Sequence, residues 1–349
     1  MTVSEKAYPS EKGEIRLIKI ENASGAYVVL SSFGAGVVEV GVPDRDGKIE
    51  NVALRYADPR SYIYDGPNMG KIPGRYANRI AEGKVSIGGK EYQLDVNLPP
   101  HHLHGGKDGF SNRNWDAEIF ENGVKFTYIS RDGEENYPGT LKVSATYRWS
   151  EDNRLSLDLF AETDAETVVN LTNHTYWNLE GADAGTALHH ELRMKAHGWL
   201  PTGKTQIPSG EVAPVVGTPM DFTEWKELGR DINEDYEPLK IGKGYDHCWV
   251  VDEWEPGKMI EDAVELRDKK SGRVMTISSD QPGVQVYTGN WLKGSPENCS
   301  GKGYEDYDGV AIEMQGFPDA PNQPQFPSQR LRPGESYARN IMFSFSVMK

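Results

Sequence analysis

The sequence predicts an all-β protein: a large antiparallel β-sandwich of stacked sheets with few short helices. Three features of its 349 residues support this fold class. Apolar and polar residues alternate with a period of two, turn signals separate the alternating runs, and helical signals are few and short. The 37 glycines and 21 prolines are spread along the chain without a low-complexity linker. We therefore expect residues 1–349 to form a single domain, because all-β folds often reach this size as one unit.

The expected strands follow from the alternation, in order along the chain. The first four are 15–20, 26–30, 37–42 and 52–56. Three hairpins follow, with turns at Gly88-Gly89 (joining 85–87 to 92–94), Asn122-Gly123 (117–119 to 124–128) and Asp152-Asn153 (141–149 to 155–159). The last strands are 264–266, 274–277, 284–287, 309–312 and 341–347. The best helical signal is 223–228, where Thr223 can cap the first turn.

Composition narrows the class of partner. Lys and Arg number 38 against 53 Asp and Glu, a net charge of −15. This acidity disfavours nucleic acids, anionic membranes and heavily phosphorylated substrates, so a neutral small molecule fits best. No apolar run approaches the roughly 20 residues of a membrane helix. The N-terminal segment lacks the apolar core of a secretion signal, so we expect a cytoplasmic protein, with export after signal removal left open.

Two cysteines limit the metal and disulfide chemistry that the chain can carry. Cys248 and Cys299 can form at most one disulfide, and neither has the paired spacing of a zinc site.

Glu313 stands in the segment richest in chemical signals. The apolar strand 309–312 leads into it, and a stiff run of Phe and Pro follows at 317–327. A carboxylate held at a strand end by rigid surroundings suits a general base. A surface glutamate is the plain alternative.

Five other segments carry more hydrogen-bonding chemistry than a scaffold needs. The first, 74–80, contains Arg75, Asn78 and Arg79. Its guanidinium groups either donate forked hydrogen bonds to vicinal hydroxyls or pair with some of the many carboxylates.

The second segment, 101–106, contains three histidines. No carboxylate or cysteine spacing accompanies them, so they do not indicate a metal site. We expect His101 and His102 in an exposed loop. Gly105-Gly106 would let the backbone approach a ligand beside His104.

The third and fourth segments are 170–179 and 244–249. His174 lies among Thr, Asn and aromatic residues, where it is either catalytic or a hydrogen-bonded core histidine. Asp246 either accepts hydrogen bonds from sugar hydroxyls, with Trp249 packing nearby, or is a turn residue.

The fifth segment, 281–291, includes a strand with two different faces. Alternation puts Gln285 and Tyr287 on one face and Val284 and Val286 on the other. The polar face suits a hydroxylated ligand, although a solvated sheet face is also common.

These five segments and the Glu313 segment, in this order, resemble the aldose 1-epimerases, also called galactose mutarotases. The resemblance covers almost the whole chain, from GRYANRI at 74–80 to QPQFPS at 323–328. It implies a galactose mutarotase-like supersandwich that acts on a monosaccharide, as a monomer or homodimer, without metal, cofactor, nucleic acid or membrane. It implies these roles: general base Glu313, general acid His174, second active-site histidine His104, and substrate binding by Asn78, Arg79, Asp246, Gln285 and Tyr287. Tyr76, Trp177 and Trp291 depart from the usual family residues, which leaves the preferred sugar open.

The implied reaction opens and recloses a cyclic hemiacetal. Glu313 would remove the O1 proton while His174 protonates the ring oxygen, and closure on the other carbonyl face gives the second anomer. This requires protonated His174 beside ionised Glu313, and we expect their proximity to favour that charged pair. Two alternatives stay open: a glycoside hydrolase using Glu313 and Asp246, and a non-catalytic sugar-binding module. A sugar-phosphate epimerase fits less well, because the candidate site lacks several clustered cations.

Overall fold

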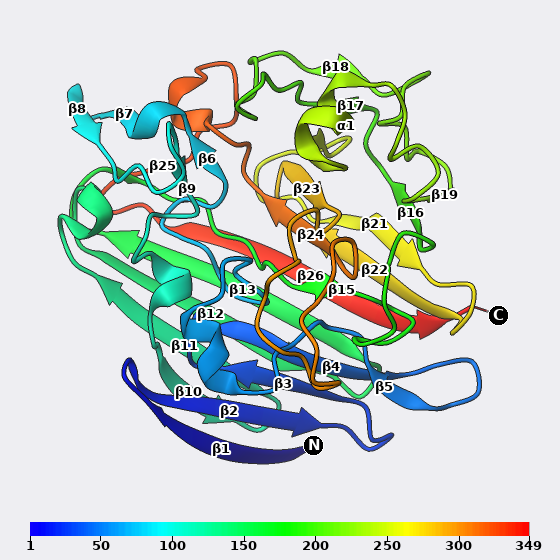
Figure 1. The fold of residues 1–349 in the computed structure, drawn as a ribbon. Helices are drawn as coiled ribbons and strands as arrows, with labels where there is room; N and C mark the ends of the chain where they lie inside the picture. Colours follow the sequence, from blue (N-terminus) through cyan, green and yellow to red (C-terminus); the bar gives the residue numbers. More distant parts are fainter. Residues whose placement is uncertain (349) are drawn as a thin grey trace.

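A computed structural model describes residues 1–348 and consists mainly of antiparallel strands, which confirms the predicted fold class (Figure 1). The N-terminal sheet has five strands in sequence order, so each pairs with the next along the chain. They are β1 (Thr2–Ser10), β2 (Gly13–Glu21), β3 (Tyr27–Ser31), β4 (Gly36–Pro43) and β5 (Ile49–Asn51).

The largest sheet has nine strands in the order β10-β11-β12-β13-β26-β22-β21-β16-β19. Their bounds are β10 (Asp116–Phe120), β11 (Gly123–Ser130), β12 (Leu141–Trp149), β13 (Arg154–Thr163), β16 (Glu191–Met194), β19 (Lys226–Glu227), β21 (Ile260–Arg267), β22 (Arg273–Ser279) and β26 (Tyr337–Val347). The C-terminal strand β26 therefore lies in the middle of the sheet, between β13 and β22.

A six-stranded sheet in the order β15-β24-β23-β20-β17-β18 lies above the nine-stranded sheet in Figure 1. Its strands are β15 (Tyr176–Trp177), β17 (Gly198–Trp199), β18 (Ala213–Pro214), β20 (Asp246–Val250), β23 (Gly283–Tyr287) and β24 (Val310–Gln315). Three two-stranded pairs complete the strands: β6 (Arg79–Ile80) with β9 (His102–Leu103), β7 (Lys84–Ile87) with β8 (Lys90–Gln93), and β14 (Thr167–Val168) with β25 (Arg330–Leu331).

Helices are few and short, as the sequence predicts. The α-helix of the described residues is α1 (Glu237–Gly242). Five 3₁₀ turns accompany it: η1 (Pro59–Ile63), η2 (Ala81–Gly83), η3 (Phe110–Asn112), η4 (Glu134–Asn136) and η5 (Ala320–Asn322). None of the helices in residues 1–348 combines the length and apolar character that crossing a bilayer would require.

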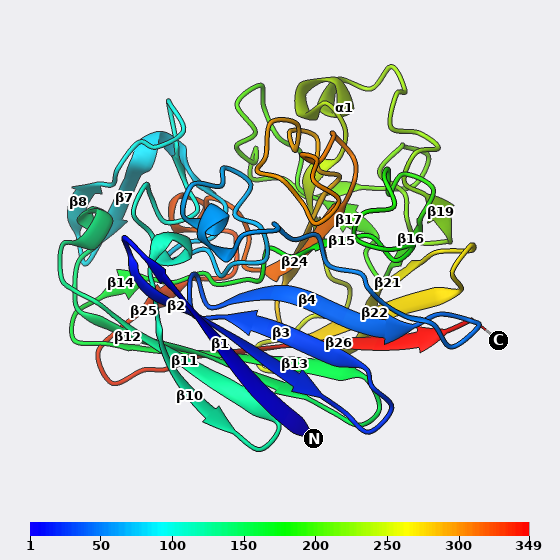
Figure 2. The same cartoon turned by 60° about the horizontal axis from the view of Figure 1, so that its bottom comes forward.

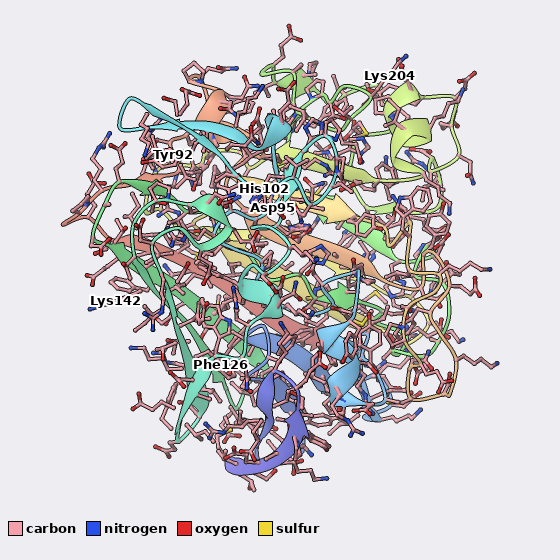
Figure 3. The ribbon with its side chains drawn as sticks, turned by 60° about the vertical axis from the view of Figure 1, so that its left-hand side comes forward. Tyr92, Asp95, His102, Phe126, Lys142 and Lys204 are labelled. Carbon is pink, nitrogen blue, oxygen red and sulfur yellow. The ribbon has the colours of Figure 1, made fainter. Side chains whose placement is uncertain are left out.

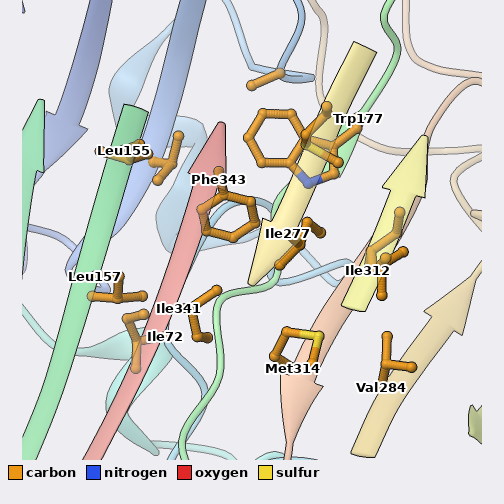
Figure 4. Close-up of a cluster of buried hydrophobic side chains, with 14 of the residues drawn as sticks. Ile72, Leu155, Leu157, Trp177, Ile277, Val284, Ile312, Met314, Ile341 and Phe343 are labelled. Carbon is orange, nitrogen blue, oxygen red and sulfur yellow. The ribbon is translucent and has the colours of Figure 1, made fainter. Parts of the chain in front are cut away.

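One continuous apolar cluster joins the three large sheets. In Figures 1 and 2 the five-stranded sheet lies against the β10–β13 side of the nine-stranded sheet. Figure 4 shows the junction with the six-stranded sheet, where Ile312 and Val284 face Ile341 and Phe343 of β26. Because these side chains are buried in the core, the opposite face of β23 and β24 remains available for contacts outside it.

Most of the predicted strands are present, but two expected elements are wrong. The segment 52–56 forms only an isolated bridge, Ala53 to Trp177, and the neighbouring strand β5 ends at Asn51. The segment 223–228 is not helical: it contains β19, which pairs with β16 in register with Glu191 and Leu192. Cross-strand pairing there overrides the local capping signal. Both cysteines are free, Cys248 buried and Cys299 exposed.

Candidate active site

The floor of the site is one face of the six-stranded sheet. Alternation in β24 sends Ile312 and Met314 into the apolar core and Glu313 to the opposite face. Residues directly opposite on antiparallel strands share a face. Two rows of side chains therefore cross this face: Glu313–Gln285–Cys248, and Tyr176–Ala311–Tyr287–Asp246.

This register corrects one expectation about Glu313. The side chain lies inside β24, with Met314 and Gln315 continuing the strand, and not at a strand end. Pairing with Gln285 on β23 holds its backbone, so a strand interior fixes the carboxylate more firmly than a strand end would. Its side chain is only 2% exposed.

His174 reaches this face from the segment just before β15. Its backbone is held from both sides, because its N–H donates to the Lys71 carbonyl and its carbonyl accepts from the Gly70 N–H, each at 2.9 Å. The Lys71 ammonium is itself buried in an ion pair with Asp65. Nε2 of His174 lies 3.5 Å from Oε1 of Glu313.

The β6–β9 pair supplies a second wall. Asn78 and His104 both have left-handed backbone, with φ of 65° and 51°. Asn78 donates its N–H to Nδ1 of His104 at 3.1 Å, and its carbonyl accepts the His104 N–H at 3.0 Å. Because Nδ1 is the acceptor, the neutral His104 ring carries its proton on Nε2. Asn78 Oδ1 accepts the Arg79 N–H at 2.8 Å, which fixes the start of β6.

Asp246 is held by three side chains. Oδ1 accepts from Gln285 Nε2 at 2.6 Å. Oδ2 accepts from Gln206 Nε2 at 2.8 Å and, at 3.4 Å, from Arg79 Nη2. Burial works against ionisation of Asp246, but Arg79, His247 and the two amides outweigh it and lower its pKa below the ordinary range. An ionised carboxylate with fixed orientation results.

These groups surround a cavity of about 570 Å³. Seven of the eight predicted site residues line it: Asn78, Arg79, His104, His174, Asp246, Tyr287 and Glu313. The eighth, Gln285, does not line this cavity; it lies beneath Asp246 and is 3% exposed.

Electrostatics corrects a second expectation. Burial raises the pKa of Glu313 well above its ordinary value; the Asp246 charge adds to this, while Arg79 opposes it. Burial lowers the pKa of His174 to about 4. Burial is the largest cause of both shifts, and it favours a neutral pair, a carboxylic acid beside an imidazole, over the charged pair. Burial likewise lowers the pKa of His104, with smaller effects of His174 and Arg79 in the same direction.

Several neighbouring residues serve the scaffold instead of the cavity. Arg75 is buried, and its guanidinium donates to Ser130, Thr167 and three backbone carbonyls. Trp249 points to the core face of β20, opposite Asp246, and donates to the Met220 carbonyl. Gly105 lies against the Gly74 carbonyl, so its missing Cβ admits backbone and not a ligand.

His101 and His102 are buried, contrary to the expected exposed loop. His102 donates from Nδ1 to the Asp95 carbonyl at 2.6 Å, and its Nε2 accepts from the Tyr137 hydroxyl at 2.6 Å. Figure 3 shows His102 beside Asp95. His101 accepts the Glu82 N–H on Nδ1. Both ring nitrogens of His102 are therefore paired, whereas the buried Nε2 of His101 has no hydrogen-bond partner among residues 1–348.

A second cluster of metal-ligand types lies elsewhere in the fold. Ligand atoms of His189, His190 and Asp268 lie within 4.8 Å of one another. Nε2 of His190, however, accepts the Leu179 N–H at 2.7 Å, so Nδ1 carries the ring proton and has no lone pair for a metal. His189 Nε2 instead lies 3.2 Å from Glu180 and 3.4 Å from Asp268.

The structure also brings in residues that the sequence did not single out as site residues. Gln206 bridges Arg79 and Asp246, and Tyr176 lies 5.1 Å, ring centre to ring centre, from His174. Tyr64 and Trp291 line the cavity mouth and are 70% and 65% exposed. Gln206 and Tyr64 occur in loops without strand alternation, so no periodic pattern marks them in the sequence. Tyr176 stands beside His174 in the segment already identified.

Comparisons with known proteins all match the same family. The family model described as aldose 1-epimerase matches residues 16–344. Galactose mutarotase of Mus musculus is 40% identical over 339 residues, which are 97% of this chain and 96% of that protein. Aldose 1-epimerase of Escherichia coli K12 is 33% identical over 333 residues, 95% of each chain. The solved structure of galactose 1-epimerase from Lactobacillus acidophilus superposes with a TM-score of 0.86 at 27% identity, covering the whole of both chains.

Proposed function

We infer the reaction of this protein from its family and its cavity: the chain belongs to the aldose 1-epimerase family. We propose that it interconverts the α- and β-anomers of hexoses such as galactose and glucose. The observation that carries the proposal is the 3.5 Å separation of Glu313 Oε1 and His174 Nε2 in a cavity that both line. A base and an acid so close can serve the two oxygens of one anomeric carbon.

The chemistry consists of two proton transfers and one bond cleavage. Glu313 takes the proton of the anomeric hydroxyl, His174 gives one to the ring oxygen, and the C1–O5 bond breaks to leave a carbonyl at C1. Rotation about C1–C2 presents the other carbonyl face, and closure reverses both transfers. Each positioned proton transfer is worth about 10²–10⁴-fold in rate.

A neutral Glu313–His174 pair, the form that burial favours, has the same number of protons as the charged pair that the reaction needs. Moving one proton from Glu313 to His174 therefore prepares the site without exchange with solvent. Arg79 favours the ionised form of Glu313, and Asp246 opposes it. Desolvation leaves the ionised carboxylate of Glu313 poorly stabilised, so it is a strong base once it has lost its proton.

The remaining polar groups suit the sugar hydroxyls. His104 presents its Nε2–H as a donor in the neutral form, a group that can hydrogen-bond the ring oxygen as charge develops there. Asp246 has lone pairs left to accept from hydroxyls, and Arg79 has a buried Nε without a partner among residues 1–348. Gln285 acts on the sugar through Asp246, whose carboxylate it orients.

Polarimetry tests the proposal. Freshly dissolved α-D-galactose or α-D-glucose should mutarotate much faster with the protein than without it, and Glu313→Gln should abolish the acceleration while galactose still binds. Release of nitrophenol from a nitrophenyl galactoside, without faster mutarotation, would support the hydrolase alternative. Near-normal turnover by Glu313→Gln would remove Glu313 from the role of base.

A further inference from the structure

Gln206 lies at the tip of a tight loop between β17 and β18. Thr202 and Pro208 form a bridge across the base of this loop. Within it, the Gln206 N–H donates to the Gly203 carbonyl at 2.9 Å, and the Gly203 N–H donates to the Ile207 carbonyl at 3.1 Å. Gln206 itself has left-handed backbone, with φ of 61°. The loop thereby turns one amide side chain into the cavity wall.

The amide lies between a cation and an anion. Its Oε1 accepts from Arg79 Nη2 at 2.7 Å, and its Nε2 donates to Asp246 Oδ2 at 2.8 Å. The direct contact between Arg79 and Asp246 is longer, 3.4 Å. An amide is the side-chain group that offers an acceptor and two donors in one plane, so it can satisfy both charges at once.

This bridge matters because Arg79 and Asp246 would otherwise close on each other. A guanidinium and a carboxylate prefer a forked contact that uses two donors and both oxygens. Such a contact would occupy the hydrogen-bond donors of Arg79 and the acceptors of Asp246 that a sugar needs. With the amide between them, Asp246 Oδ1 accepts from one donor only, and Arg79 Nε has no partner among residues 1–348, so both groups keep hydrogen-bonding capacity for a sugar.

We propose that Gln206 is a positioning residue for sugar binding, which limits the contact between Arg79 and Asp246 to one long hydrogen bond and orients both groups so that the pair engages neighbouring hydroxyls of a pyranose. This inference rests on the proposed function, since it concerns the same cavity. Gln206 acts through its two charged neighbours and needs no contact with the reacting carbon. Its effect is therefore on sugar affinity and on the charge of Asp246, more than on the chemical step.

Two substitutions separate this role from simple packing. Gln206→Leu removes both hydrogen bonds at nearly constant volume. Gln206→Glu keeps the size and the acceptor for Arg79, but replaces the donor to Asp246 with a second negative charge. If Gln206 only fills space, the neutral Leu of similar volume should be harmless. If it positions the pair, Leu should weaken binding, and Glu should weaken it at least as much, because its charge also repels Asp246.

The test measures galactose binding in the Glu313→Gln background, where residue 313 cannot titrate, by calorimetry or ligand-observed NMR between pH 4 and 8. We expect Gln206→Leu to weaken binding by about 10- to 100-fold, the loss of roughly one hydrogen bond to a charged group. As the pH is lowered, Gln206→Glu should lose affinity for galactose first, Gln206→Leu next and the parent last. This order follows because each substitution raises the pKa of Asp246. In the active enzyme the change should appear in KM, with kcat within a few-fold.

Gln325→Leu is the matched control. Gln325 is an exposed amide that donates to the Gly210 carbonyl of the same segment and does not line the cavity, so its loss should leave affinity and pH dependence unchanged. Normal binding by Gln206→Leu, or an unshifted acid limb in both variants, overturns this inference alone. No galactose binding to the parent overturns the proposed function as well.

Discussion

Replacing the buried acid Glu313 with Gln should stabilise the fold, increasingly so as the pH rises. An unfolded glutamate loses its proton above about pH 4.3, whereas burial keeps the folded Glu313 protonated well beyond that. Between these two pKa values the folded state holds one more proton than the unfolded state. The free energy of unfolding of the wild type then falls by about 1.4 kcal/mol per pH unit. Gln lacks this penalty, so its stability advantage over the wild type should grow with pH from about pH 5 up to the raised pKa of Glu313.

Urea unfolding of both variants at half-unit pH steps measures this difference. Contributions of other titrating groups are common to both proteins and cancel in the difference. One of them is His174, whose pKa of about 4 makes the free energy of unfolding rise with pH in both proteins. Glu162→Gln makes the same change at an exposed position of β13 and controls for the substitution itself. A difference between Glu313→Gln and wild type that stays flat across this range would show that Glu313 ionises near its ordinary pKa, and the neutral pair described above would be wrong.

Two further predictions concern the walls of the site. Lys71→Met leaves the Asp65 carboxylate buried without its cation, and the free energy of unfolding measured in urea should fall by about 3–5 kcal/mol. The double variant Asp65→Asn/Lys71→Met should recover much of that loss. A double variant as unstable as the single one would contradict the ion-pair explanation. Asp246→Asn should raise the KM for galactose by about 10–100-fold. Because the Asp246 charge raises the pKa of Glu313, the same variant should also keep activity to lower pH, and a polarimetric pH–rate profile with an unmoved acid limb would refute that coupling.

The sequence predicted the strands whose faces differ and missed what depends on distant partners. In β12, β13 and β23 buried apolar residues occupy every second position, because one face meets the core, and that alternation correctly separated Gln285 and Tyr287 from the apolar side. The segment 52–56 has apolar residues but only a single-bridge partner, and Lys226 of the expected helix is drawn into β19. Local propensity cannot report either outcome.

The same limit applies to the site. Residue types and order identified seven residues that line the cavity, because catalytic groups carry recognisable chemistry. Gln206 was missed because an amide in a loop has no periodicity. The opposite pKa shifts of Glu313 and His174 were also missed, because desolvation depends on the folded interior and not on neighbouring residues in the sequence.

The strict in–out order of β24 makes this strand intolerant of any change in length. Deleting one residue of β24 ahead of Glu313 would point the carboxylate into the apolar core and turn an isoleucine or methionine toward the cavity. Surface turns tolerate insertions and deletions, but the number of residues in β24 must be preserved for the protein to fold and to catalyse its reaction.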